Sequence, residues 1–344
     1  MSIISINDFA KTNKGLQFFK ILASPTHRLG LRFSRYMRKK YDRVLGLSLL
    51  KYIRKEYNRV LQVILISKTP AVSCVLYGRP EIHSLVSHRH TYNYILAIKS
   101  LLRFYNDVTV IVHDDGSLTK KDKRTIKKHI ENINIIDRDY ADEKINKKLD
   151  HYPNCRRYRD EYVNSLQLFD FMFISESSKI ISLDSDILFF KKPETLVDWL
   201  RDGKNIIPLW EREPFRSREF LAKINLDDCF IPMCIGLMCF YKEIMDLDLL
   251  EEILSKIKIF DWWTGQGVYP ILVNKHIKKH ELSFFEPSLY QDGHGFSDGQ
   301  ISRHYWFSRG TSNIYLSDRK RIIRELMNGL IDKSNQHLES VLKK

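Results

Sequence analysis

The sequence predicts an α/β fold in which helices flank a mainly parallel sheet. Two observations predict it. Short apolar runs rich in β-branched residues alternate with segments of helical spacing, and Gly, Pro or Asp residues end most of these runs. The 344 residues are 43% hydrophobic and 12% aromatic, which is enough for a sizeable core in one large or two ordinary domains.

The elements are expected in alternating order along the chain. They are a buried strand at 71–77 (AVSCVLY), a helix at 91–105, a strand at 107–113 (DVTVIVH), a helix from Ser117, a strand at 133–137 (INIID), a helix at 156–173, a strand at 178–183 (SKIISL) and a helix opening at Pro193-Glu194. The order of strand and helix favours parallel pairing, because each helix can carry the chain back to the same edge of the sheet.

Two carboxylates, Asp184 and Asp186, follow directly on the buried strand that ends at Leu183. Ligands of such sheets bind beyond the carboxyl ends of the strands, and residues two apart on an extended chain point the same way. Paired carboxylates repel each other unless a cation or a shared proton lies between them. Mg²⁺ or Mn²⁺ is the simplest cation for this site. The alternative is a polar turn in which the carboxylates cap nearby N–H groups.

The segment IISLDSDILFFKKPETLVDW (180–199) resembles the Asp-x-Asp region of nucleotide-sugar glycosyltransferases of the GT-A fold. The resemblance extends over about residues 71–316. Residues 71–77 and 97–117 resemble the first strand, first helix and second strand of that fold, and residues 164–186 resemble the helix and strand that carry the Asp-x-Asp. The run MCIGLMCFYKE (233–243) resembles the strand with a central glycine, here Gly236, and HYWFSRG (304–310) resembles the segment with the late histidine. The resemblance implies a Rossmann-like domain in which a divalent metal on the Asp-x-Asp holds the diphosphate of the donor.

Parts of the chain depart from either branch of that superfamily. The retaining branch, which includes family-eight enzymes, has Asn-Ser before the glycine, whereas this chain has Cys234-Ile235. The late histidine lacks the Gly and Lys-Pro that usually follow it. The Asp114-Asp115 turn is more similar to inverting family-two enzymes, in which an aspartate after the second strand binds the uracil ring. Retention or inversion of configuration therefore stays open.

The resemblance implies roles for particular residues. Asp184, Asp186 and His304 would bind Mn²⁺ or Mg²⁺, although His304 is also interpretable as a partly buried member of an aromatic cluster. The residues assigned to the nucleotide-sugar donor are Tyr77, Arg79, Asp114, Asp115, Ser185 and Arg309. A carboxylate at Asp114 or Asp115 would accept the N3–H of uracil, or would instead bond its own turn. Arg303 is a further candidate for a phosphate contact.

The acceptor side is expected at FDWWTGQGVYPIL (260–272). Asp261 would be the general base of an inverting enzyme, Gln266 would orient a hydroxyl group, and Trp262 and Trp263 would stack on a sugar. In the alternative interpretation the tryptophans are core residues and Thr264 caps a helix. The rival carboxylates are Glu211, Glu213, Asp292 and Asp298, the last two within a glycine-rich loop.

Most of the positive charge lies in a basic N-terminal arm. Residues 1–68 hold 15 Lys and Arg against 3 Asp and Glu, and the remaining residues hold 41 against 39. The arm has amphipathic helical spacing, which suits either an anionic membrane surface or a solvated helix packed on the body. No nucleic-acid-binding motif occurs. We therefore expect a basic arm (1–68), a GT-A domain (69–316) and a C-terminal amphipathic helix (317–344).

The predicted function is sugar transfer from a nucleotide-sugar, with UDP as the expected nucleotide, to a glycan or glycolipid. Five cysteines without a CxxC pair suit a reducing compartment. Neither a signal peptide nor a spanning run of 18 apolar residues is expected, so we predict a cytoplasmic, peripheral enzyme. Two alternatives remain open: a metal-dependent phosphohydrolase of the haloacid-dehalogenase type, which also places Asp-x-Asp at a strand end, and a non-catalytic basic membrane-binding scaffold.

Overall fold

The computed structural model describes residues 57–58, 60–211, 215–277, 281–293, 299–305 and 312–342. It divides into two units, residues 1–68 and 69–344. In the first unit, residues 60–67 are helical, and most of the predicted basic arm lies outside the described residues. Among the described residues no helix is both long and apolar enough to cross a membrane. The strands among the described residues, and the candidate site, all lie in the second unit.

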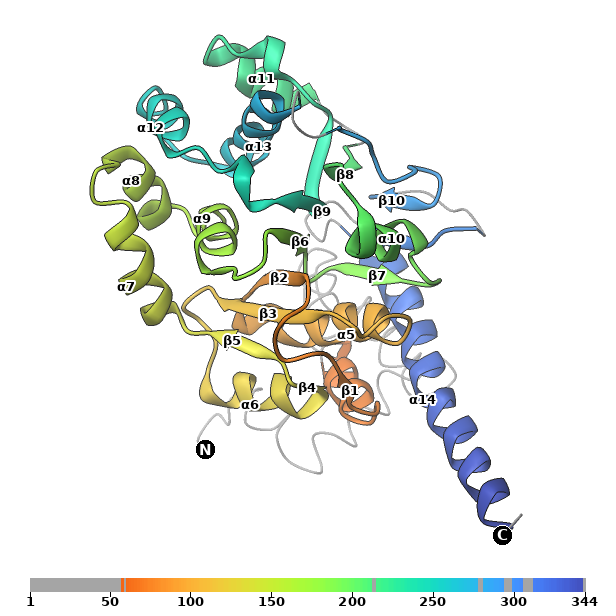
Figure 1. Cartoon of the computed structure of the whole chain (residues 1–344). Coiled ribbons are helices and arrows are strands. Elements are labelled where there is room, and N and C mark those ends of the chain that lie inside the picture. Colours follow the sequence, from red (N-terminus) through yellow and green to blue (C-terminus); the bar gives the residue numbers. More distant parts are fainter. Residues whose placement is uncertain are drawn as a thin grey trace, which may run out of the picture. The chain divides into compact units, whose positions relative to one another are not determined.

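A six-stranded sheet forms the centre of the second unit (Figure 1). In spatial order its strands are β5 (Asn134–Ile136), β3 (Thr109–Asp114), β2 (Glu81–Val86), β6 (Lys179–Leu183), β9 (Met233–Tyr241) and β8 (Ile207–Trp210). The first four run parallel, and β9 pairs antiparallel with both β6 and β8. The predicted α/β class with a mainly parallel sheet is therefore confirmed.

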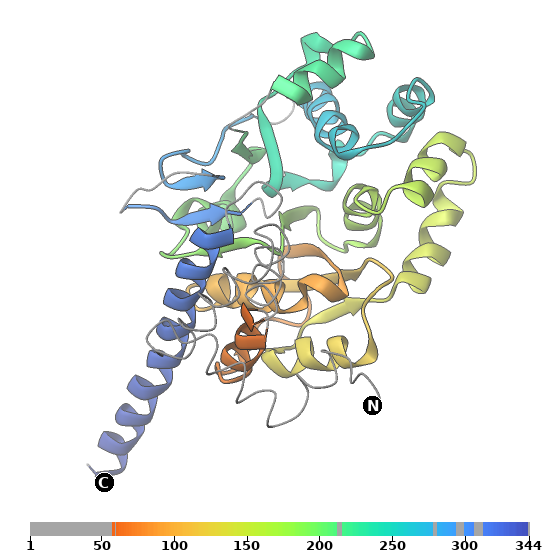
Figure 2. The same cartoon turned by 180° about the vertical axis from the view of Figure 1, so that it is seen from behind.

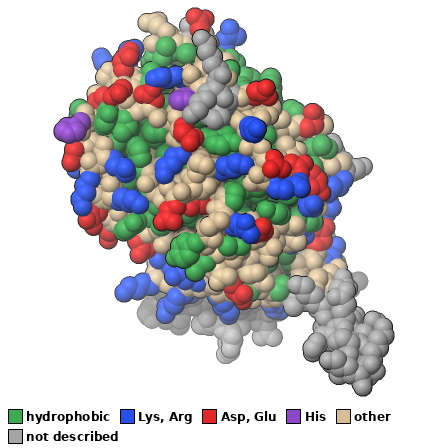
Figure 3. All heavy atoms as spheres, in the orientation of Figure 1, with side chains coloured by type: hydrophobic (Ala, Val, Ile, Leu, Met, Phe, Trp, Pro, Cys, Tyr) green, Lys and Arg blue, Asp and Glu red, His purple; other side chains and the backbone are tan. Residues whose placement is uncertain are grey.

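Helices surround this sheet. They are α5 (Thr91–Leu102), α6 (Lys120–His129), α7 (Arg138–Lys148), α8 (Pro153–Glu161), α9 (Ser165–Ile174), α10 (Glu194–Asp202), α11 (Phe215–Lys223), α12 (Leu247–Ser255), α13 (Trp262–His276) and α14 (Ser312–Leu342). Helix α9 packs on β2 and β6, and α13 packs on β9. The long helix α14 passes along α5 (Figure 2). Acidic and basic side chains mingle on the face in Figure 3, as the near-balanced charge of residues 69–344 predicts.

A second, three-stranded sheet covers the carboxyl edge of β6. It consists of β10 (Tyr290–Asp292), β11 (Ser302–His304) and β7 (Ile187–Phe189), and β7 continues from β6 through the turn at 184–186. Its register places His304 opposite Ile187 on one side and opposite Asp292 on the other. Residues more than 100 positions apart in sequence are therefore brought beside the two carboxylates.

The expected strand at 71–77 is wrong as a core element. Val72–Ser73 forms the short strand β1, which pairs with β4 (Ile130–Glu131) outside the main sheet, and Val75 makes only an isolated bridge to Thr109. The first core strand is β2, whose sequence EIHSLV looks too polar to be buried. It is buried because its polar side chains bond inside the fold: His83 Nδ1 lies 2.8 Å from His113 Nε2, and His83 Nε2 lies 3.0 Å from Glu81 Oε2.

Two other expected boundaries also change. The helix expected at 156–173 is broken into α8 and α9 by a turn at 162–164. Helix α14 begins at Ser312, ahead of the expected start at 317. The remaining expected helices and strands lie within a few residues of the observed ones, so the division of the chain between strand and helix is largely as the sequence indicated.

Buried histidines make folding sensitive to acid. Burial lowers the pKa of His83 and lowers that of His113 further, and the positive charges of Lys99 and Lys128 assist burial in lowering the pKa of His129 to about 4. Each folded-state pKa therefore lies below the unfolded value of about 6.5. The unfolded chain takes up protons first as pH falls, so their contribution to stability is complete above pH ~6.5 and is lost progressively below it, in the case of His129 as pH falls toward about 4.

We predict that the free energy of unfolding, measured by urea titration, falls between pH 7 and pH 5. A His129→Gln variant should show a shallower decline over the same range, because one of the titrating groups has been removed. Equal unfolding free energies at pH 7 and pH 5 in the wild-type protein would contradict this assignment.

Candidate functional site

The turn between β6 and β7 is fixed from two sides. The backbone N–H of Asp184 donates to the carbonyl of Gly236 on β9 at 2.7 Å, and the N–H of Tyr305 donates to the carbonyl of Asp186 at 2.9 Å. The side chains of Asp184 and Asp186 are 21% and 15% exposed, so both carboxylates are mostly buried and still reach solvent. The fold therefore holds the two acids together at the carboxyl edge of the sheet.

His304 completes this cluster. Its Nε2 lies 3.2 Å from Asp186 Oδ1 and 3.6 Å from Asp184 Oδ2. The ligand atoms of the three residues lie within 4.8 Å of one another. Two carboxylate oxygens and one imidazole nitrogen form a donor set that suits Mn²⁺, and Mg²⁺ somewhat less. The structure thus brings together the three residues that the sequence assigned to a metal.

Three further neighbours lie against the imidazole ring of His304. A Cβ atom at Gly236 would lie 2.7 Å from its Cε1, so only glycine leaves room for the ring at this point of β9. Its Nδ1 lies 2.8 Å from Asp292 Oδ1 and 3.5 Å from Cys234 Sγ. The ring is therefore held with Nε2 toward the paired acids and Nδ1 toward the protein interior.

The charges in the cluster favour a cation. Burial alone would lower the pKa of His304, but the charge of Asp186, with smaller contributions from Cys234 and Asp292, raises that pKa well above its ordinary value. Burial first, and the charge of Asp186 after it, raises the pKa of Asp184 to about 6, against an opposing effect of His304. Positive charge on His304 thus offsets the repulsion between the acids, and a divalent cation would supply the same compensation.

A small pocket opens beside Asp184 on the side of α9 and α13. Gln167, at the start of α9, donates from Nε2 to Asp184 Oδ1 at 2.9 Å. Aromatic and amide side chains share the lining, namely Tyr158, Tyr162, Trp262, Tyr269, Asn164 and Gln266. Gln266 is buried, and within the described part of the chain its Oε1 has no hydrogen-bond partner. Gln266, which the sequence assigned to the acceptor side, therefore lines the same pocket as Asp184.

Asp261 has a different place from the one expected of a catalytic base. It is the N-cap of α13, where its Oδ1 accepts N–H groups of Trp263 and Thr264 at 2.9 and 3.1 Å. It faces a groove formed with α11 and does not line the pocket beside Asp184. The sequence interpretation foresaw a cap here, although it assigned the cap to Thr264 rather than Asp261.

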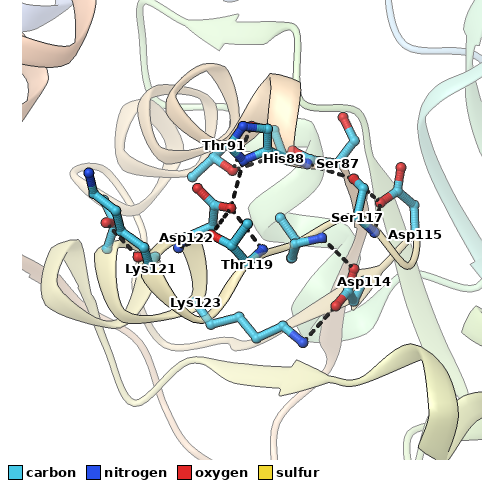
Figure 4. A network of polar contacts seen from close by, with 12 residues as sticks. Ser87, His88, Thr91, Asp114, Asp115, Ser117, Thr119, Lys121, Asp122 and Lys123 are labelled. Atoms are coloured by element: carbon cyan, nitrogen blue, oxygen red, sulfur yellow. Dashed lines mark hydrogen bonds and ion pairs between the residues drawn. The ribbon is translucent and has the colours of Figure 1, made fainter.

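The turn after β3 separates the roles of Asp114 and Asp115 (Figure 4). The carboxylate of Asp114 accepts N–H groups of Gly116 and Leu118 at 2.8 and 3.0 Å, and it pairs with Lys123 at 2.6 Å. The carboxylate of Asp114 therefore stabilises the turn. Asp115 is only half-buried and accepts from Ser117 at 2.9 Å. Of the two carboxylates, Asp115 is the one still presented to a ligand.

Sequence reasoning missed the segment that follows β2, Ser87 to His90. It occupies the carboxyl edge between β3 and β6, with His88 Nδ1 2.7 Å from Asp122 Oδ2 and the N–H of His88 donating to Ser117 Oγ (Figure 4). Burial lowers the pKa of His90, while the charges of Asp186 and Asp115 act to raise it, which places His90 within reach of both acids. The available signal was Ser-His-Arg-His directly between a β-branched run and a helix.

Three expected donor contacts lie elsewhere. Tyr77 and Arg79 precede β2 and therefore lie at the amino edge of the sheet, where Arg79 pairs with Asp107 at 2.9 Å. Choosing residues 71–77 as the first core strand caused this error. Arg303 is fully buried and bonds Asp318 at 3.0 Å, so it ties β11 to α14 instead of reaching a phosphate. Ser185 does lie within the turn, and Arg309 lies outside the described residues.

No protein-family model and no curated protein matches the sequence. Solved structures similar to the chain include the galactosyltransferase LgtC in complex with donor and acceptor sugar analogs, at 14% identity over 71% of this chain and 95% of that chain, with a TM-score of 0.48. Mouse xyloside xylosyltransferase 1 is similar at 13% identity over 69% and 99%, with a TM-score of 0.41. The glycosyltransferase GlyE of Streptococcus pneumoniae is similar at 11% over 75% and 64%, with a TM-score of 0.43.

We predict that Gly236→Ala weakens Mn²⁺ binding by about 10- to 100-fold, the range typical of losing a group that orients a metal-ligating histidine. The added methyl group must push the His304 ring away from the carboxylates. Mn²⁺ titration followed by electron paramagnetic resonance measures the effect. Gly329→Ala is the matched control, because an added Cβ there meets nothing within 4 Å. Unchanged Mn²⁺ affinity in a folded Gly236→Ala protein would contradict the prediction.

Proposed function

We propose that the chain is a metal-dependent glycosyltransferase that moves a sugar from a nucleotide-sugar donor to a glycan or glycolipid acceptor. The observation that carries this proposal is the convergence of Asp184, Asp186 and His304 within 4.8 Å at the carboxyl edge of the sheet. A site of this kind suits a ligand with a diphosphate group, because a divalent metal bridges carboxylates and phosphate oxygens.

The bound metal would act as a Lewis acid that neutralises the charge developing on the leaving diphosphate. Asp184 and Asp186 would hold it through oxygen, and His304 would hold it through Nε2, a nitrogen ligand that favours Mn²⁺ over Mg²⁺. The mostly buried position of the carboxylates strengthens these electrostatic contacts relative to water. The chain's own part is to fix the ligands before the donor arrives.

The nucleotide of the donor would lie across the carboxyl ends of β2 and β3. Asp115 supports this placement, since its half-buried carboxylate lies at that edge and would accept the N3–H of uracil. His90 lies within electrostatic reach of both Asp115 and Asp186, and would contact the donor between base and diphosphate. We therefore propose UDP as the nucleotide of the donor.

The sugar would occupy the pocket between Asp184 and α13. Trp262 is 51% exposed there and offers a ring face, and the amide of Gln266 would bond a sugar hydroxyl. Among the described residues that line the pocket, none is Lys, Arg or His. This lining suits an uncharged sugar, because it offers the carboxylate of an acidic sugar no basic side chain to pair with.

We predict that Asp184→Asn with Asp186→Asn abolishes both Mn²⁺ uptake and release of nucleoside diphosphate from UDP-sugars, a loss of at least about 10²-fold in rate. Asp198→Asn, at an exposed carboxylate on α10, is the matched control and should leave both unchanged.

The products also separate the proposal from the two alternatives. Release of nucleoside diphosphate supports a transferase. Release of phosphate from monoesters in its place would indicate a phosphohydrolase, and neither product would indicate a scaffold. Activity and Mn²⁺ uptake that survive the double substitution would contradict the proposed role of both acids.

We also propose that the basic arm, residues 1–68, attaches the enzyme to an anionic membrane surface from the cytoplasmic side. Its charge excess and amphipathic spacing support this proposal. Replacing Lys51, Arg54 and Lys55 with Gln should weaken binding to vesicles of phosphatidylglycerol and phosphatidylcholine, measured by flotation, by about 100-fold, since each of the three cations contributes ~1 kcal/mol near an anionic surface. Equal flotation of the two proteins, or equal flotation with neutral vesicles, would contradict it.

A further inference from the structure

The imidazole of His304 uses its two nitrogens on opposite sides. Nε2 faces Asp184 and Asp186, whereas Nδ1 lies 2.8 Å from the carboxylate of Asp292. The Asp292 side chain is 2% exposed, compared with 21% and 15% for the paired acids. Parallel pairing of β10 with β11 sets Asp292 directly opposite His304, so this contact is built into the sheet register.

We propose that Asp292 is a positioning residue that keeps the proton of His304 on Nδ1 and thereby leaves the lone pair of Nε2 to a metal on Asp184 and Asp186. This inference rests on the proposed metal-dependent function and deepens it. A histidine that ligates through one nitrogen needs its other N–H directed at an acceptor, which fixes the tautomer and ring orientation and raises the basicity of the ligating nitrogen.

The other contacts of the ring do not provide this control. Cys234 Sγ lies 3.5 Å from Nδ1, and a thiol is a weak acceptor compared with a carboxylate. Gly236 lies against the ring itself and leaves the choice between the two nitrogens open. Asp292 is thus the contact that favours the proton on Nδ1, whereas Asp186, 3.2 Å from Nε2, would bind the metal in place of a proton on that nitrogen.

The same geometry argues against a metal on the opposite nitrogen. Cys234, Asp292 and His304 also lie within ligand distance of one another, and all three are buried. A metal bound there would need Nδ1, which would break the short contact with Asp292. The Nε2 side has partly exposed carboxylates, so it is the side that a donor diphosphate can approach.

The test compares Mn²⁺ binding by the full-length wild-type protein with that by Asp292→Asn. We expect the variant to bind Mn²⁺ about 10- to 100-fold more weakly. An asparagine can present its NH₂ group to Nδ1, which moves the ring proton to Nε2. Pulsed electron paramagnetic resonance should therefore also show a weakened coupling of Mn²⁺ to an imidazole nitrogen, a signature that a loss of stability alone would not alter.

Asp318→Asn is the matched control. Asp318 is a buried carboxylate that accepts from Arg303 and Tyr305, the two residues flanking His304, at 3.0 and 2.5 Å. Asp318 supports the same strand through these two residues, whereas Asp292 contacts the ring itself. The Mn²⁺ affinity and nitrogen coupling of Asp318→Asn should therefore match those of the wild type. A Cys234→Ala variant should likewise retain both.

Three results would overturn the inference. Unchanged affinity and nitrogen coupling in Asp292→Asn would show that Asp292 does not control the ring. An equal loss in Asp318→Asn would show that loosening of β11 is the cause. A loss in Cys234→Ala together with retention in Asp292→Asn would move the control to the thiol. Wild-type Mn²⁺ binding that survives Asp184→Asn with Asp186→Asn would instead refute the proposed function, and the inference with it.

Discussion

The central constraint on this structure is the repulsion between the carboxylates of Asp184 and Asp186, which the fold holds close together at the edge of an apolar sheet. Backbone bonds from β9 and β11 fix the turn that carries Asp184 and Asp186, so the acids cannot separate to lower their mutual energy. Bringing like charges together is unfavourable unless a positive charge lies between them. The charge of Asp186 raises the pKa of His304, which favours a positive imidazole beside the acids, and a divalent cation would compensate them more strongly. The need for a positive charge beside Asp184 and Asp186 therefore links the fold to the proposed metal-dependent reaction.

The three-stranded sheet is the part of the fold that meets this need. Strand β7 leaves the main sheet directly after the acids, and its pairing with β11 brings in His304 from more than 100 residues away. Strand β11 is fixed on its other side by the buried pair of Arg303 with Asp318, which ties it to α14. Breaking such a buried pair is costly, because it leaves an uncompensated charge inside the protein. The pair of Arg303 with Asp318 therefore stabilises the corner of the fold that carries β11.

The pattern of apolar and polar residues was sufficient to predict most of the helices and strands and the paired acids, because each of these depends on residues that are close together in the sequence. The spacing of Asp184 and Asp186 after a buried strand needs no tertiary information, whereas the assignment of His304 came from a family resemblance. The errors came from side chains that satisfy one another across strands. Glu81 and His83 made β2 look like a surface segment, and this displaced the expected donor contacts to Arg79 at the wrong edge. The roles of Asp114, Asp115 and Asp292 depend on turn geometry and strand register, which a single sequence does not reveal.

The most direct test of the metal centre is anomalous diffraction at the manganese absorption edge from crystals grown with Mn²⁺ and UDP. One peak is expected, bounded by Asp184, Asp186 and Nε2 of His304, with ligand distances of about 2.0–2.3 Å and the diphosphate on its open side. A peak on the side of Cys234 and Asp292, or UDP bound without any peak near the paired acids, would contradict the account.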